Sequence, residues 1–61
     1  MNKDDARKEF WNLCYNYIDN KNLDDYLKIK KLIEIFKETD PSFYRLSMNV
    51  CKVLNIDLKE I

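Results

Sequence analysis

Apolar and polar side chains along the first two thirds of the chain follow the spacing of α-helices. Apolar residues recur every three or four positions between Lys3 and Asp19, and again from Leu23 onward, which places them on one face of a helix. The second stretch also carries Leu27 and Ile35 outside its main apolar arc. A helix that is apolar on more than one side usually packs on more than one side. We therefore expect the second helix to lie in the middle of a bundle or to form part of an interface.

The side chains expected in the core follow from these two periodic patterns. On the first helix they are Ala6, Phe10, Leu13, Cys14, Tyr17 and Ile18. On the second helix they are Leu23, Tyr26, Ile29, Leu32, Ile33 and Phe36.

Asparagine and aspartate residues mark the ends of these two helices. Asn2 or Asp4 can accept a hydrogen bond from the free N–H groups at the start of the first helix, and Asn22 can do so for the second. The chain contains no glycine, the residue that most often ends a helix in the left-handed conformation. We therefore expect Asn20 to take that conformation between the two helices.

A third helix is predicted after the sequence Thr39-Asp40-Pro41-Ser42. Proline suits the first position of a helix because its missing N–H group would be unpaired there in any case, and Asp40 is expected to cap the helix from the position before it. The helix should run to about Leu54 and end at Asn55, after which one more turn capped by Asp57 would dock on the bundle. The expected core face consists of Phe43, Leu46, Val50, Val53 and Leu54, with Ser47 filling a small gap.

The connections between the predicted helices are short. Linkers of three or four residues make consecutive helices pack against each other, mostly antiparallel. The chain contains no internal repeat, low-complexity tract or composition change that would mark a boundary. We therefore expect residues 1–61 to form a single all-α domain, a small three-helix bundle with a short C-terminal helical turn.

The composition narrows the classes of protein to which the chain can belong. It is 46% hydrophobic and 36% charged, with 11 basic and 11 acidic side chains, whereas disordered chains are poorer in apolar residues and further from neutral. No apolar run approaches the roughly 20 residues that a membrane span needs. Two cysteines are too few for a secreted disulfide framework, and the charged N-terminus lacks the apolar stretch of a signal peptide. We therefore expect a cytoplasmic protein without a membrane partner.

The amino-acid composition is biased toward residues that AT-rich codons encode. Nine Lys stand against two Arg, with seven Asn and six Ile, a bias typical of AT-rich genomes. The chain is therefore expected to come from a low-GC bacterium, its plasmid or its bacteriophage.

Signals of catalysis are absent from the sequence. There is no histidine, the commonest general base near neutral pH, and no glycine-rich loop of the kind that cradles phosphates. Cys14 and Cys51 lack the spacing of metal ligands. We therefore expect no enzymatic activity, cofactor, metal or small-molecule substrate. The two thiols either fill the core as small apolar side chains or meet across the bundle as a redox-sensitive pair.

Several aromatic and apolar residues lie beside the expected core faces. Trp11 and Tyr15 are one helical turn apart on the first helix, and Tyr44 and Met48 are one turn apart on the third. Such residue types are enriched in protein interfaces, and a chain this short often gains stability by binding a partner. The other helices of the bundle would cover the same side chains in the alternative interpretation. The candidate interface residues are Trp11, Tyr15, Leu27, Ile35, Tyr44 and Met48.

A polar stripe on the third helix points to a different class of partner. Arg45, Asn49 and Lys52 are spaced four and three apart, and Arg and Asn side chains read guanine and adenine edges. The net charge of zero and the pI near 6.2 lack the general positive charge that attracts DNA. The alternative interpretation of this stripe is a solvated polar face.

Two segments are similar to known families. Residues 41–61 combine Pro-Ser, a Leu-bearing helix and the ending Leu-Asn-Ile-x-Leu-x-x-Ile; the residues involved are Pro41, Ser42, Leu46, Leu54, Asn55, Ile56, Leu58 and Ile61. This pattern resembles the last two helices of repressor-type helix-turn-helix domains, with one extra residue in the middle and without the Ala and Gly of the turn that precedes. The second segment, from Glu9 to Ile35, resembles the helical hairpin of small histidine-kinase inhibitors from sporulating bacteria. Its matching residues are Glu9, Phe10, Tyr15, Leu23, Tyr26 and Ile35.

These observations lead to one hypothesis and one alternative. The first is a small non-catalytic regulatory or inhibitor protein of a bacteriophage or another mobile element. It would bind a protein partner, or a second copy of itself as a dimer, through an apolar helical face. The alternative is a compact DNA-binding transcriptional regulator of the helix-turn-helix type that uses Arg45, Asn49 and Lys52.

Overall fold

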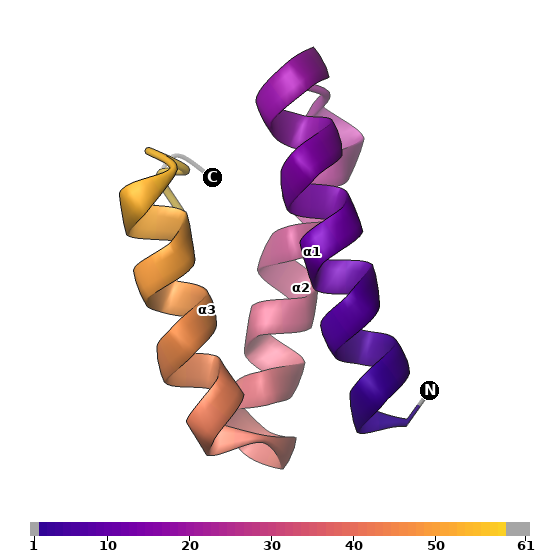
Figure 1. The fold of residues 1–61 in the computed structure, drawn as a ribbon, viewed down its shortest axis with the longest axis vertical. Coiled ribbons are helices and arrows are strands. Elements are labelled where there is room, and N and C mark those ends of the chain that lie inside the picture. The colour runs from indigo at the N-terminus through magenta and orange to yellow at the C-terminus, as the bar shows by residue number, and fades with distance from the viewer. Residues whose placement is uncertain (1, 59–61) are drawn as a thin grey trace.

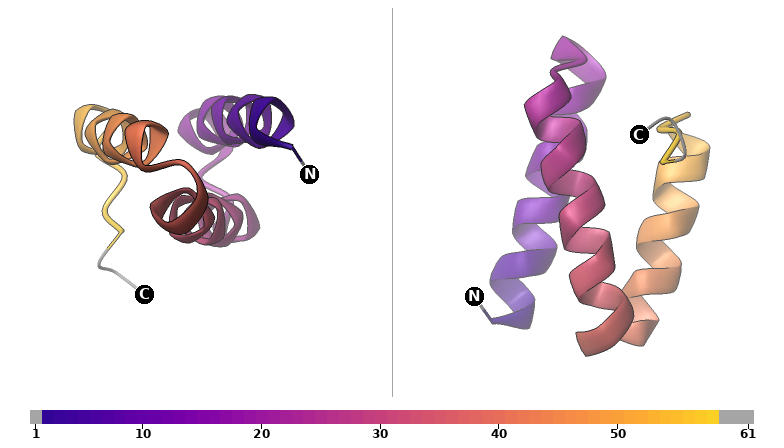
Figure 2. Two further views of the ribbon diagram at one scale, coloured as in Figure 1. Left: turned by 90° about the horizontal axis from the view of Figure 1, so that it is seen from below. Right: turned by 180° about the vertical axis from the view of Figure 1, so that it is seen from behind.

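The fold is an all-α three-helix bundle, as the sequence predicts. The computed structural model describes residues 2–58 and forms α1 (Lys3–Asn20), α2 (Leu23–Thr39) and α3 (Pro41–Val53) within them. Consecutive helices run antiparallel, and α2 packs against both α1 and α3 (Figure 1). Viewed along the helices, α1 and α3 lie on the same side of α2 (Figure 2). The main apolar arc of α2 thus packs against both neighbours, whereas Leu27 and Ile35, outside that arc, are exposed.

Three polar residues mark both ends of α1 and the start of α2. The Asn2 side chain accepts a hydrogen bond from the Asp5 N–H at 2.8 Å, and the Asn22 side chain caps α2 in the same way. The residue in the left-handed conformation is Lys21, with φ 52°, because α1 continues through Asn20; the expectation of Asn20 at this position is wrong. The Lys21 ammonium lies 5.1 Å from the centre of the Tyr17 ring, a cation–π contact that offsets part of the cost of this backbone conformation.

Asp40 joins α2 to α3 as the only residue between them. Its N–H donates to the Phe36 carbonyl and its own carbonyl accepts from the Tyr44 N–H, both at 2.8 Å, so its backbone belongs to both helices. Asp40 is the N-cap residue of α3, as predicted, but its side chain makes no capping hydrogen bond to that helix. Instead the carboxylate oxygen Oδ2 accepts a hydrogen bond from Nε of Arg7 at 2.9 Å and forms an ion pair with Nη2 at 2.8 Å. The Arg7 guanidinium also lies 5.0 Å from the centre of the Phe43 ring. The side chain of Asp40 therefore ties α1 to the junction of the other two helices.

The electrostatics of this ion pair follow from its burial. Burial by itself raises the pKa of the Asp40 carboxyl group, but the hydrogen bond and positive charge of Arg7 outweigh it, so that the pKa lies below its ordinary value.

The end of α3 turns the chain back toward the core. Asn55 takes the left-handed conformation, with φ 59°, as predicted. Its N–H donates to the Lys52 carbonyl and the Ile56 N–H donates to the Cys51 carbonyl, the pair of bonds that defines a Schellman motif. This turn buries Ile56, and the Tyr26 hydroxyl then donates to the backbone carbonyl of the following residue. The predicted docking of the segment is confirmed as far as residue 58. Residues 56–58 are not helical, and the rest of the predicted turn, residues 59–61, lies outside the described residues.

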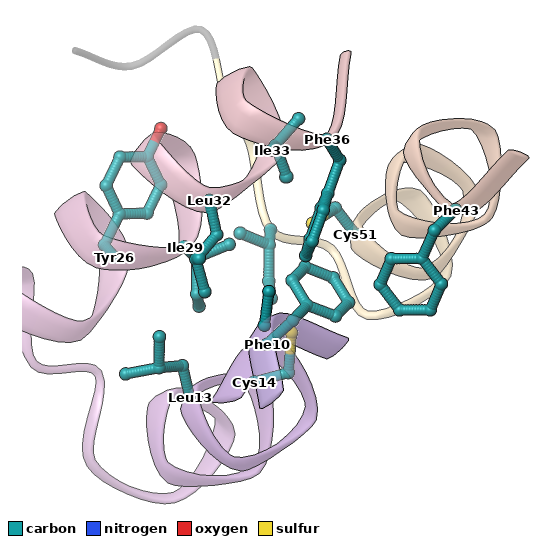
Figure 3. Close-up of a cluster of buried hydrophobic side chains, with 12 residues drawn as sticks. Phe10, Leu13, Cys14, Tyr26, Ile29, Leu32, Ile33, Phe36, Phe43 and Cys51 are labelled. Atoms are coloured by element: carbon teal, nitrogen blue, oxygen red, sulfur yellow. The ribbon is translucent and has the colours of Figure 1, made fainter. Parts of the chain in front are cut away.

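Three phenylalanines, one from each helix, form the centre of the core (Figure 3). The Phe10 ring contacts Phe36 and Phe43 edge to face at centroid distances of 6.0 and 5.7 Å, and the latter two rings are 4.8 Å apart. Phe10 and Phe36 are almost completely buried. Edge-to-face contacts of this kind stabilise a core beyond the burial of apolar area, so the three rings fix where the helices meet.

The core face of α3 differs from the predicted one. Its buried line consists of Phe43, Ser47 and Cys51, whereas Leu46 and Val53 are exposed. The two small residues reduce the bulk of the buried face of α3, and the Ser47 hydroxyl is satisfied by donating to the Tyr44 carbonyl at 2.8 Å. With the small residues on the buried face, the larger aliphatic side chains lie on the flank.

Two residues on the other helices were also predicted in the core and are exposed. They are Ile18, near the end of α1, and Leu23, in the first turn of α2. Both lie at the end of the bundle where α3 diverges from the hairpin of α1 and α2 (Figure 1).

Candidate protein-interaction surface

An apolar groove runs between α1 and α3. It encloses about 350 Å³ and no residue of α2 lines it. We call it the α1–α3 groove and define it by its lining residues, which are Trp11, Cys14, Tyr15, Leu46, Asn49, Val50, Val53 and Leu54. Each of the two helices packs well against α2 but makes few backbone contacts with the other. The groove exists because α2 holds α1 and α3 side by side without bringing them together on their outer side.

The α1 wall of the groove contains the two aromatic residues predicted as interface anchors. Trp11 is half-buried, since its ring contacts Phe10 and Phe43 at centroid distances of 5.7 and 6.4 Å. Tyr15 lies one turn further along and is 64% exposed. Trp11 therefore has both a core role and a surface role, whereas the side chain of Tyr15 belongs to the surface.

The α3 wall consists of the aliphatic residues that were expected in the core. Leu46 is 46% exposed and Val53 is 78% exposed, with the half-buried Val50 between them. They are spaced four and three apart, so they form a single stripe along the helix. Sequence reasoning missed this role because it assigned the stripe to the core. The available signal was that apolar residues spread over more than half of the circumference of α3, with the smallest ones, Ser47 and Cys51, at the centre.

Polar residues follow the outer edge of the α3 wall. Arg45, Asn49 and Lys52, the predicted nucleic-acid stripe, are all exposed, and Asn49 lines the groove itself. Neither cation forms an ion pair with any of residues 2–58, and α3 contains no acidic residue. The groove is therefore lined mainly by apolar side chains, and the two cations lie beside it on α3 without an ion pair among residues 2–58.

The other four predicted interface residues lie elsewhere. Leu27 is 42% exposed on the side of α2 that faces away from the core, and Ile35 is exposed on the flank of α2 toward α1. Ile35 lines a shallower groove of about 250 Å³ whose charged members are Glu9, Lys28 and Lys31. On α3, Met48 is exposed and Tyr44 half-buried, and their helical positions are on the flank opposite Leu46 and Val53. The six residues are thus all at least partly accessible, but only Trp11 and Tyr15 line the α1–α3 groove.

The two thiols meet inside the bundle behind the α1–α3 groove. Cys14 of α1 and Cys51 of α3 are both buried and unoxidised. The hydrogen bond with Cys51, together with burial, raises the pKa of Cys14 above its ordinary value. Their burial agrees with the interpretation that they fill the core as small side chains. They also meet across the bundle, and the redox sensitivity of the pair stays a prediction.

Other classes of site have little support in the described residues. Within residues 2–58 no three His, Cys, Asp or Glu side chains lie together in a way that could hold a metal ion. None of the helices α1 to α3 is long and apolar enough to cross a membrane.

Comparison with known proteins gives no relative from which a function could be transferred. No family model matches the chain, and neither a curated protein nor a solved structure is significantly similar to it. The function must therefore be inferred from the surface itself.

Proposed function

We propose that this chain is a small non-catalytic regulatory or inhibitor protein that binds a protein partner through the α1–α3 groove. The observation that carries the proposal is the set of apolar side chains that the groove leaves open to solvent, above all Tyr15, Leu46 and Val53. Single exposed apolar residues are ordinary, but a continuous apolar surface between two helices is typical of an interaction site. The half-buried ring of Trp11 beside them is the type of residue that anchors interfaces.

The composition supports a narrower proposal about origin and location. A cytoplasmic protein of a low-GC bacterium, encoded by a bacteriophage or another mobile element, agrees with the excess of Lys over Arg and with two cysteines that remain unpaired.

Leu46→Ser tests the proposed function, with Leu27→Ser as its matched control. Both are exposed leucines in the middle of a helix, 46% and 42% exposed, so both changes should leave the free energy of unfolding almost unchanged. Proteins captured from a lysate of the source organism on immobilised wild-type chain should be retained by Leu27→Ser and lost by Leu46→Ser. Truncating an anchor costs about 2 kcal/mol or more, which weakens binding about thirtyfold.

Two results would contradict the proposal. One is a captured protein that binds both variants equally, which would place the interface away from the groove. The other is loss of binding only in Leu27→Ser, which would move the site to α2. Sedimentation of the free chain up to high concentration shows separately whether a second copy fills the groove.

A DNA-binding regulator is the second candidate, supported by one observation. Arg45, Asn49 and Lys52 form an exposed stripe without acidic neighbours on α3. In such a stripe the amide side chain could contact a base edge while the two cations contact phosphates. Such binding should be strongest at low salt because it depends on counterion release. A complete absence of binding to duplex DNA at low ionic strength would exclude this candidate.

A further inference from the structure

The apolar side chains along the α1–α3 groove are spaced as expected of a binding site for a helix. Its α3 wall presents Leu46, Val50 and Val53, which span two helical turns, or about 10 Å at 1.5 Å per residue. The α1 wall presents Trp11 and Tyr15 over one turn. An amphipathic helix offers apolar side chains at the same spacing of three and four residues. A helix in the groove would pack on α1 and α3 together, on the side that α2 does not cover.

The charges around the groove are distributed unevenly. Arg45 and Lys52 lie two turns apart on α3, one turn before and one turn after Asn49, which lines the groove. Both are exposed and form no ion pair among residues 2–58. Lys52 also lines the hollow on the other flank of α3, together with Asp57. The α1 edge near Tyr15 is mixed, with Lys8 on one side and Asp19 on the other. A partner that carries carboxylates opposite α3 would neutralise two cations that form no ion pair with the described residues.

We propose that the occupant of the α1–α3 groove is an amphipathic helix of another protein with acidic side chains along the edge that faces Arg45 and Lys52. This inference rests on the proposed function and names the chemistry of its partner. Carboxylates spaced seven residues apart on the bound helix would lie opposite the two cations, while its apolar stripe covers Tyr15, Leu46 and Val53.

The same charges argue against the other occupants. A symmetric dimer through this groove would surround one apolar interface with the Arg45 and Lys52 side chains of both copies, where like charges repel. Duplex DNA would pair with the cations but would leave the apolar walls of the groove open to water, because phosphates contact only the α3 edge.

Two synthetic peptides test the charge of the partner. Both are amphipathic helices of about 18 residues with the same leucine stripe; one carries glutamate and the other lysine along the edge of the stripe. Binding is measured by nitrogen–proton correlation spectra of the labelled chain and by the fluorescence of its single tryptophan, Trp11. We expect shifts at Tyr15, Leu46 and Val53, with the acidic peptide bound about tenfold more tightly at low salt and this preference reduced at about 150 mM salt.

Charge reversal provides the matched control. The double variant Arg45→Glu and Lys52→Glu should bind the lysine peptide more tightly than the acidic one. The double variant Lys28→Glu and Lys31→Glu changes the same amount of charge on α2 and should keep the preference of the wild type.

Each contrary outcome has a distinct meaning. Equal binding of both peptides in the groove would overturn the acidic partner and leave the proposed function standing. No shift in the groove with either peptide at about 1 mM would overturn both. Binding of a short DNA duplex at Arg45, Asn49 and Lys52 in place of the peptides would make nucleic acid the partner. Self-association that Leu46→Ser abolishes would make a second copy the occupant.

Discussion

Replacing Phe10 by leucine tests whether the three phenylalanines hold the bundle together. Phe10 is 0% exposed, and its ring contacts Trp11, Phe36 and Phe43 at centroid distances of 5.7, 6.0 and 5.7 Å. Leucine keeps an apolar side chain there but removes all three aromatic contacts, each of which contributes about 0.5–1.5 kcal/mol beyond area burial. Because a smaller side chain and some repacking recover part of this loss, we expect Phe10→Leu to lower the free energy of unfolding by about 2 kcal/mol.

That loss is large on the scale of the whole domain. At about 0.05–0.15 kcal/mol per residue, 61 residues have a free energy of unfolding of about 3–9 kcal/mol. Urea and thermal unfolding followed by circular dichroism should show a melting temperature lower by about 8–16 °C. Phe10→Ala would cost about 3–5 kcal/mol and would leave too little folded protein for a quantitative comparison.

Tyr15→Leu is the control for this experiment. It makes the same change from an aromatic ring to leucine on the same helix, at a residue that is 64% exposed. It should change the free energy of unfolding by less than about 0.5 kcal/mol. If both variants lost the same stability, the packing described around Phe10 would be wrong.

Two further predictions concern titratable groups. The pKa of Asp40 in the folded chain lies below its ordinary value of 3.8, so its contribution to stability is complete above the unfolded pKa and is lost as the pH falls through the folded one. Asp40→Asn should therefore melt below the wild type at neutral pH and converge with it toward about pH 2; a constant difference at every pH would refute this role. Cys14 and Cys51 are each 1% exposed, so an aromatic disulfide reagent should label them far more slowly than it labels the unfolded chain, with a rate that rises in urea as the bundle opens. Immediate labelling of either thiol in native buffer would show that the core around them is open.

Much of the fold could be predicted from the sequence because helix period and helix ends are local properties. The three helices, the caps at Asn2 and Asn22 and the left-handed Asn55 all depend on residues within a few positions of each other. The predicted left-handed residue was Asn20 and the observed one is Lys21, because α1 is one residue longer than expected. The contact of the Lys21 side chain with Tyr17 contributes to this difference.

The rotation of α3 about its own axis could not be predicted from the sequence, and this explains the errors at the candidate site. Its apolar residues cover more than half of the helix, so the period alone does not decide which part faces the core. The side that is buried carries two small residues, Ser47 and Cys51. Their place at the centre of the apolar arc is a signal in the sequence, but how closely the other helices pack there depends on those helices as well. Trp11 and Tyr15 were predicted as surface anchors and line the groove, whereas Leu46 and Val53 were assigned to the core.

The central position of α2 has a consequence for how the chain folds. Nearly all helix pairing joins neighbours along the chain, first with second and second with third, so the average loop that must close is short. Small domains with mainly local contacts fold at the fast end of the range of known folding rates, and refolding is expected in microseconds to milliseconds. The contact between Arg7 and Asp40 spans 33 positions. It joins the start of α1 to the end of α2, so it can form only once these two helices have paired along their whole length. A newly made chain should therefore bury its three core phenylalanines soon after the third helix has been synthesised. The α1–α3 groove would then be exposed to other molecules as soon as the chain has folded.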